Sequence, residues 1–123
     1  MTILETKRTL VRHGTHNDAP FIMQLLNEPG WIRFVGDRNI HDLDAARKFI
    51  DDRLLSSYLK HGFGLYIVDE KATECSIGLC GFVKRDTLDA PDIGYAITES
   101  HHGMGYAFEV STALIDYGHD TMG

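Results

Sequence analysis

The sequence predicts a single α/β (α+β) domain whose sheet is mostly antiparallel and flanked by helices. The apolar period changes from helical to alternating after Gly62, which marks a passage from helices to strands. Two short polar connections, residues 69–74 and 85–91, then separate three apolar runs, as in an antiparallel meander. A chain of 123 residues has room for one domain, which we expect to span residues 1–123.

The first half of the chain is expected to contain one strand and two helices. Residues 9–13 alternate weakly and predict a strand. Thr15 and Asp18 have the spacing of a helix cap, and Pro29-Gly30 would end the helix that they begin. A second helix is expected from Asp42, because apolar residues recur there at helical spacing: Leu43, Ala46, Phe49, Ile50 and Leu54. Residues 31–40 are interpreted as irregular.

The second half is expected to contain three consecutive strands and a last helix. The strands cover residues 63–68, 75–84 and 92–98. Both alternating sets of the first strand are apolar, which favours a strand covered on both faces. The last helix begins near Tyr106, and its apolar face is formed by Tyr106, Ala107, Val110, Ala113, Leu114 and Tyr117.

Composition and charge exclude several classes of protein. The formal net charge is −6, so neither nucleic acid nor an anionic membrane surface is an expected partner. Cys75 and Cys80 are interpreted as two small buried hydrophobic residues without a disulfide. The start of the chain lacks the apolar stretch of a signal peptide, and no run is long enough to span a membrane. We therefore expect a cytoplasmic protein, and no metal site among the seven histidines.

The most informative segment is a strand that runs through a glycine-containing turn into the last helix. Gly103 and Gly105 lie in this turn, where glycine permits positive φ and close approach of the backbone. Amides at a helix start suit a phosphate or pyrophosphate, and without Lys or Arg in the loop backbone dipoles would hold the anion. A tight strand-to-helix connection without a ligand is the alternative interpretation. The pattern is neither a Walker loop nor a good Rossmann fingerprint.

The chain resembles the GNAT superfamily of acetyl-CoA-dependent N-acetyltransferases, in particular the RimJ/RimL-like ribosomal-protein-alanine N-acetyltransferase branch. The likeness extends over nearly the whole chain and includes Leu4-Glu5-Thr6, Leu10-Val11-Arg12, Gly62-Phe63-Gly64-Leu65, Ile77 to Asp86 and Asp92-Ile93-Gly94-Tyr95-Ala96. The family signature Gln/Arg-x-x-Gly-x-Gly/Ala falls on residues 102–107, with His102 at the Gln/Arg position. The resemblance implies the N-terminal part of a GNAT fold, with a mostly antiparallel mixed sheet flanked by helices.

The resemblance also implies an activity and its site. Acetyl-CoA would be the cosubstrate, without a metal, and its acetyl group would pass to a primary amine, either a protein N-terminus or a small amine. The backbone of Ile97 would meet the pantetheine amide. Asp92 is the candidate general base, although a carboxylate at a strand start is commonly just solvated. Backbone amides would hold the pyrophosphate, from His102, Gly103, Met104, Gly105, Tyr106 and Ala107.

The resemblance finally bears on the extent of the domain. The family continues from the last helix into further strands, so we expect a single GNAT-like domain over residues 1–123 that lacks the family's C-terminal strands. An exposed sheet edge at residues 92–98 would then favour a homodimer. The alternative function is a GNAT-derived fragment that binds CoA or associates with a partner chain but has little or no catalytic activity.

Overall fold

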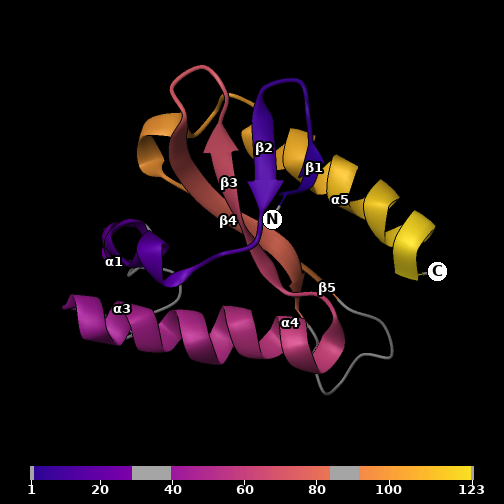
Figure 1. The fold of residues 1–123 in the computed structure, drawn as a ribbon. Coiled ribbons are helices and arrows are strands. Elements are labelled where there is room, and N and C mark those ends of the chain that lie inside the picture. Colours follow the sequence, from indigo (N-terminus) through magenta and orange to yellow (C-terminus); the bar gives the residue numbers. More distant parts are fainter. Residues whose placement is uncertain (1, 29–39, 84–91, 123) are drawn as a thin grey trace.

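The computed structural model describes residues 2–28, 40–83 and 92–122, and its centre is a five-stranded sheet (Figure 1). The strands lie in the order of the sequence, and neighbours pair antiparallel throughout. The expected antiparallel meander is therefore confirmed. The strands are β1 (Thr2–Glu5), β2 (Thr9–Arg12), β3 (Leu65–Glu70), β4 (Cys75–Val83) and β5 (Asp92–Ile97). The apolar residues of β1, Ile3 and Leu4, are adjacent and show no alternation, so this strand was not among the expected ones.

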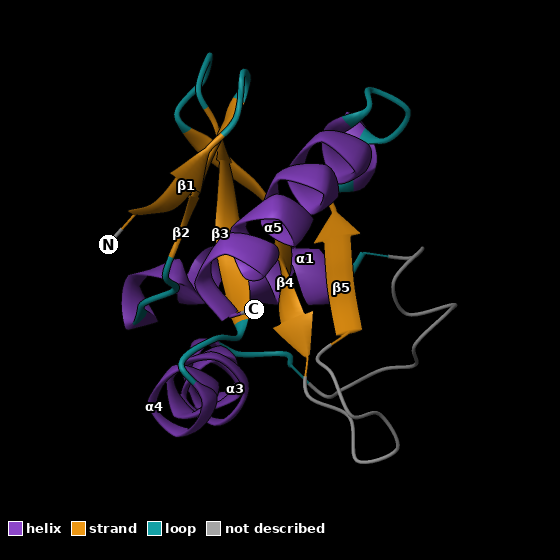
Figure 2. Cartoon of the chain, turned by 90° about the vertical axis from the view of Figure 1, so that its right-hand side faces the viewer, coloured by secondary structure: helices purple, strands orange, loops and turns teal. Residues whose placement is uncertain are grey.

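Helices cover both faces of the sheet (Figure 2). The long helix α5 (Tyr106–Met122) crosses one face, and α1 (Ala19–Leu26) lies on the other. The second expected helix is one continuous helix with three parts, which are α3 (Leu43–Phe49), η2 (Ile50–Leu55) and α4 (Ser56–His61). Two short 3-10 turns, η1 (His16–Asp18) and η3 (Glu99–His101), precede α1 and α5.

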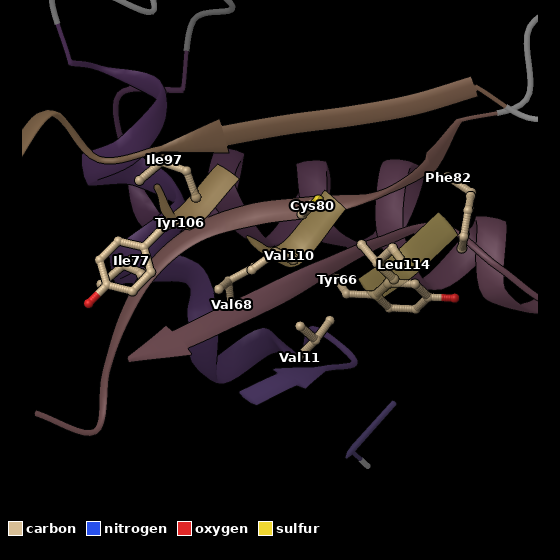
Figure 3. Packing of buried hydrophobic residues seen from close by; sticks show 10 residues of the cluster. All are labelled: Val11, Tyr66, Val68, Ile77, Cys80, Phe82, Ile97, Tyr106, Val110 and Leu114. Atoms are coloured by element: carbon tan, nitrogen blue, oxygen red, sulfur yellow. The ribbon is translucent and has the colours of Figure 1, made fainter. Parts of the chain in front are cut away.

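The two faces of the sheet pack two separate hydrophobic clusters. Alternation along β3 sends Tyr66 and Val68 towards α5 and Ile67 towards α1 and α3. Figure 3 shows the cluster beneath α5, where Val110 and Leu114 are completely buried. Ile77 joins the same cluster through a bulge, because Val68 pairs with Gly78 and Asp69 pairs with Ser76, which leaves Ile77 as the extra residue.

The expected helix boundaries follow from local hydrogen bonds. Thr15 and Asp18 form the predicted capping box. Asp42 caps α3, its Oδ1 accepting from the amide of Ala45 at 2.7 Å. Gly62 ends α4 in the left-handed conformation, with φ at 77°. The expected end at Pro29-Gly30 and the irregular segment 31–39 lie outside the described residues.

The middle part of this long helix, η2, is π-helical, which the sequence pattern did not predict. The buried residues Ala46, Ile50 and Leu54 follow each other in steps of four. Four residues of an α-helix turn about 40° beyond a full circle, so such a row drifts around the helix. The wider π turn cancels this drift and keeps Ile50 and Leu54 against the sheet.

Arg12 joins three elements through a partly buried ion pair cluster. Its Nη2 lies 2.8 Å from Asp18 Oδ1 and its Nε lies 2.7 Å from Asp69 Oδ2. Burial by itself would raise the pKa of Asp18, but hydrogen bonds from Arg12 and from the Thr15 amide outweigh it and hold that pKa below its usual value. The cluster connects the end of β2 to the start of α1 and to β3.

The two cysteines do not share the environment expected from the sequence. Cys80 is buried as predicted, but Cys75 is exposed, because it opens β4 directly after the turn at residues 71–74. The expectation of two buried thiols is therefore wrong for Cys75, and neither cysteine is in a disulfide. Over the described ranges, no helix is long and apolar enough to cross a membrane.

Candidate functional site

A groove of about 730 Å³ runs between the outer edge of β5, the first turns of α5 and the end of α1. The strand contributes Tyr95, Ala96 and Ile97 to its lining. Leu25, near the end of α1, and Glu28, just after it, also line the groove. Phe108 and Ser111 of α5 line the opposite wall. The groove therefore lies where the sequence placed its strand, glycine turn and helix.

The backbone of β5 faces this groove at alternate residues. The Thr98 amide donates to the carbonyl oxygen of Ile77 at 2.9 Å, just beyond the end of β5. Hydrogen-bonded and non-hydrogen-bonded pairs alternate along an antiparallel ladder. Ile97 and Tyr95 therefore belong to non-hydrogen-bonded pairs, and their own N–H and C=O groups point away from β4. They form an outer edge with which an extended ligand can pair.

The loop between β5 and α5 presents the start of the helix to the same groove. Gly103 and Gly105 have φ of 75° and 82°, so both require the left-handed conformation that glycine adopts without strain. The Glu109 amide donates to Gly105 O at 3.0 Å, which makes Gly105 the N-cap. The amides of residues 106–108 precede the helical hydrogen bonds and have no acceptor within the helix. With the helix dipole, they favour a negatively charged group.

Histidines hold the loop to the strand that precedes it. His102 Nε2 lies 2.6 Å from the carbonyl oxygen of Ile97 and must donate, since a carbonyl oxygen only accepts. His101 Nδ1 lies 3.0 Å from Thr98 Oγ1, and its Nε2 lies 3.5 Å from a Glu70 carboxylate oxygen. The Ile97 carbonyl is thus already engaged, which leaves the Ile97 amide as the open group of this residue.

Tyr106 anchors the start of α5 to the sheet. Its side chain is buried, and its hydroxyl donates to Glu70 at the end of β3. This hydrogen bond lowers the pKa of Glu70 and raises the pKa of Tyr106, because it stabilises the charged carboxylate and the neutral phenol. On the other side of the ring, the Arg8 guanidinium carbon lies 4.2 Å from the ring centre.

Arg8 comes from the turn between β1 and β2 and was not found from the sequence. Its Nε lies 2.7 Å from Glu109 Oε1, and its amide donates to Glu109 Oε2 at 3.0 Å. A Cβ atom added to Gly105 would lie 3.4 Å from Arg8 Nη2. The loop itself contains no Lys or Arg, but the fold places the guanidinium of Arg8 beside it.

The residues expected at the site fall into three groups. Most line the groove: Ile97, His102, Gly103, Gly105, Tyr106 and Ala107. Met104 is 53% exposed and does not line it. Asp92 begins β5 opposite Val83, roughly 17 Å along the strand from Ile97. Its side chain lies outside the described part of the structure, so its role as a base stays a prediction.

Sequence reasoning missed the residues that reach the groove from distant parts of the chain. Glu28 Oε1 accepts from the Glu99 amide at 3.0 Å, across 71 positions of sequence. Leu25 of α1 also lines the groove. In the described ranges, no group of three or more His, Cys, Asp or Glu residues is placed to hold a metal ion.

Comparison with known proteins agrees with this geometry. A family model described as an acetyltransferase (GNAT) domain matches residues 8–123. The uncharacterized N-acetyltransferase p20 of Bacillus licheniformis is 29% identical over 119 residues, which are 96% of this chain and 66% of that protein. The chain thus spans about two thirds of the length of this relative.

Solved structures give the same result for the fold. The crystal structure of an acetyltransferase from Agrobacterium tumefaciens superposes with a TM-score of 0.79 at 26% identity, covering 99% of this chain and 68% of that one. RimL, a ribosomal alpha-N-protein acetyltransferase in complex with coenzyme A, superposes with a TM-score of 0.79 at 19% identity, over 96% of this chain and 67% of RimL. The family model, the sequence relative and the shared architecture agree, and the chain belongs to the GNAT acetyltransferase family.

Proposed function

We propose that this chain binds acetyl-CoA in the groove between β5 and α5 and transfers the acetyl group to a primary amine. The observation that carries the proposal is the placement of two complementary backbone surfaces in one groove. The outward N–H and C=O groups of Tyr95 and the outward N–H of Ile97 suit the amides of a pantetheine arm. The free amides at the start of α5 suit its pyrophosphate.

The residues of the loop fit this ligand in detail. A Cβ atom added to Gly103 would have nothing within 4 Å, so the space beside this residue is open to phosphate oxygens. The Ile97 amide would donate to a pantetheine carbonyl, while His102 keeps the Ile97 carbonyl engaged. Of the six proposed pyrophosphate amides, those of Tyr106 and Ala107 give the strongest case, because they lack acceptors within the helix.

The reaction requires a neutral amine. An α-amino group has a pKa of about 8 and a lysine about 10.4, so a proton must leave before the nitrogen attacks the thioester carbonyl. The new C–N bond forms as the C–S bond breaks, and the thiolate is then protonated. We propose Asp92 as the base, since it starts the strand along which the pantetheine arm would lie. A net charge of −6 favours the approach of a cationic acceptor, either a protein N-terminus or a small amine.

A matched pair of glycine variants tests the binding site. Gly105→Val and Gly62→Val both place a branched residue at φ near 80°, but only Gly105 lies in the loop. We expect both to destabilise the fold, and only Gly105→Val to weaken CoA binding in calorimetry. Equal CoA affinity of Gly105→Val and the parent would contradict the assignment.

The transfer itself is tested by release of CoA thiol over a panel of N-terminal peptides and polyamines. Because Cys75 is exposed and would react with the thiol reagent, the assay uses a Cys75→Ser background. Release with at least one amine, reduced in Asp92→Asn, is the expected result. Binding of acetyl-CoA without release for any amine would favour the alternative function, a CoA-binding domain without transferase activity.

We further propose that the chain forms a homodimer through β5 when no ligand lies along this edge, since a second copy and a pantetheine arm would pair with the same outward backbone groups. The strand lies at an edge of the described sheet, with Tyr95 59% exposed beside Phe108 at 78%. Tyr95→Pro removes an outward N–H without breaking a bond to β4, so the sheet should persist. Light scattering should report a dimer for the parent and a monomer for this variant. A parent that stays monomeric over a wide concentration range would contradict the dimer.

A further inference from the structure

We infer that Arg8, from the turn between β1 and β2, contacts the pyrophosphate of the bound CoA directly through its Nη atoms. The inference rests on the proposed function and adds a residue to it that lies outside the loop signature. Within the described residues, the side-chain hydrogen bonds of Arg8 use Nε alone, on Glu109. A guanidinium carries five N–H donors, so the four on Nη1 and Nη2 remain available to a ligand.

The position of these donors is fixed from two sides. The ion pair with Glu109 and the face of the Tyr106 ring hold the guanidinium plane. Its Nη2 lies 3.4 Å from the point where a Cβ of Gly105 would sit, beside the N-cap of α5. A guanidinium held in this way forms charge-assisted hydrogen bonds to phosphate with little further loss of rotamer freedom.

The location separates Arg8 from the pantetheine arm. Arg8 does not line the groove, whose walls come from β5, α1 and α5. It approaches Gly105 from the side of the β1–β2 turn, and its side chain keeps 39% of its surface exposed. Its donors are therefore placed to meet a group at the helix start, and not one that lies along β5.

A second effect of Arg8 must be separated from direct contact. Glu109 is a carboxylate one turn into the helix, and a bare negative charge there would repel phosphate. Burial alone would raise the pKa of Glu109, but hydrogen bonds from Thr6 and Arg8 outweigh it, so the group stays ionised at neutral pH. Removing Arg8 could weaken anion binding merely by uncovering this charge.

The experiment measures Kd for CoA and dephospho-CoA in four variants: the parent, Arg8→Gln, Glu109→Gln and the double variant. Direct contact predicts that Arg8→Gln weakens both ligands about tenfold, in the parent and in the Glu109→Gln background alike. Lys7→Gln, which removes the same charge from an exposed position in the same turn, should change Kd less than twofold, as expected for a screened charge. Thermal unfolding of each variant establishes that the protein measured is folded.

Each other outcome has a definite meaning. No effect of Arg8→Gln in the Glu109→Gln background would show that Arg8 only neutralises Glu109 and would overturn the inference. A loss confined to CoA would place Arg8 at the 3′-phosphate, which also overturns it. A parent that binds neither ligand would overturn the proposed function itself. If Arg8→Gln unfolds, Arg8→Lys serves in its place and should recover part of the affinity.

Discussion

At the scale of single residues, His102 shows how a side chain can shape a site that consists of backbone. It donates to the carbonyl oxygen of Ile97, five positions earlier, and so closes the segment between β5 and the glycines. This position carries Gln or Arg in the family signature that the chain resembles. In this chain the histidine at that position donates through its Nε2–H to the end of the strand.

His102→Ala should therefore weaken CoA binding without removing any proposed ligand contact. One hydrogen bond contributes about 1 kcal/mol, so Kd measured by calorimetry should rise about fivefold. His102→Gln, which keeps a side-chain donor, should restore most of the affinity. His61→Ala is the control, because His61 is exposed, stacks on Phe63 and does not line the groove. An unchanged Kd for His102→Ala would show that the loop keeps its shape without this bond.

The two cysteines should differ sharply in reactivity. Burial raises the pKa of the Cys80 thiol to about 11, so at pH 8 only about one molecule in a thousand carries the thiolate. Cys75 is exposed. Mass spectrometry after iodoacetamide treatment at pH 8 should find one adduct on the native protein and two after unfolding. Cys75→Ser should show none while folded, and a rapid adduct on that variant would contradict the buried position of Cys80.

Part of the site could be predicted from residues and part could not. Gly103 and Gly105 lie between an apolar strand and a helix, so positive φ there follows from local chemistry. The outward direction of the Ile97 backbone depends on which carbonyl of β4 pairs with Thr98, and sequence does not specify that register. Arg8 reaches Glu109 across 101 positions, and no local pattern announces such a contact.

At the scale of elements, Arg12 links β2 to the start of α1 and to β3 through two ion pairs. Its guanidinium serves a carboxylate at the start of α1 and another on β3. Asp18 has only 8% of its side chain exposed, so it depends on this partner for its charge. The pair of Arg47 with Asp44 is different, because it lies on the surface and leaves the side chain of Asp44 94% exposed.

Arg12→Met should lower the free energy of unfolding by about 3 kcal/mol at pH 7, because it leaves a buried carboxylate without its partner. In the parent the pKa of Asp18 is lowered, so its contribution is present above the unfolded pKa of about 3.9 and is lost as the pH falls through the folded value. In the variant, burial raises that pKa instead. Urea unfolding at several pH values should show that the difference in the free energy of unfolding between the parent and Arg12→Met shrinks below about pH 4.

Arg47→Met provides the comparison, and it should cost less than about 0.5 kcal/mol at any pH. Equal destabilisation by the two substitutions would mean that the buried cluster is no stronger than a surface pair. If the difference in unfolding free energy between the parent and Arg12→Met stayed constant from pH 7 to pH 3, the protonation of Asp18 would not be linked to unfolding.

The helices and strands could be predicted where the signal lies within the segment itself, as a capping residue or an apolar periodicity. Thr15 with Asp18 and the step at Gly62 marked helix boundaries that the structure confirms. Two features escaped, β1 and the π-helical turn η2. A strand of four residues is stabilised by its pairing with β2, and η2 by the sheet that Leu54 must reach. In both cases tertiary packing decides what local propensity leaves open.

At the scale of the whole molecule, the sheet separates two hydrophobic clusters that have no fully buried residue in common, and Tyr58 packs against both. Leu114 is fully buried between α5 and the sheet, and Leu54 is fully buried on the opposite face. Leu114→Ala and Leu54→Ala should each lower the free energy of unfolding by about 2–5 kcal/mol. The effects in the double variant should be additive within about 0.5 kcal/mol in urea unfolding, since the two leucines lie in different clusters on opposite faces of the sheet. A larger departure would mean that the sheet transmits strain between its faces.

The alternation of β5 has a consequence for how this protein can change over evolutionary time. Alternate residues of the strand hold it to β4, and the residues between them, Tyr95 and Ile97, present the edge proposed to grip the ligand. A slip by a single residue would exchange the two sets and turn every side chain of β5 to the opposite face, which would take Ile97 out of the cluster beneath α5. Stability and ligand binding therefore require the same register of this hairpin. Selection for folding alone would already preserve the edge proposed to bind acetyl-CoA, ahead of any selection for affinity.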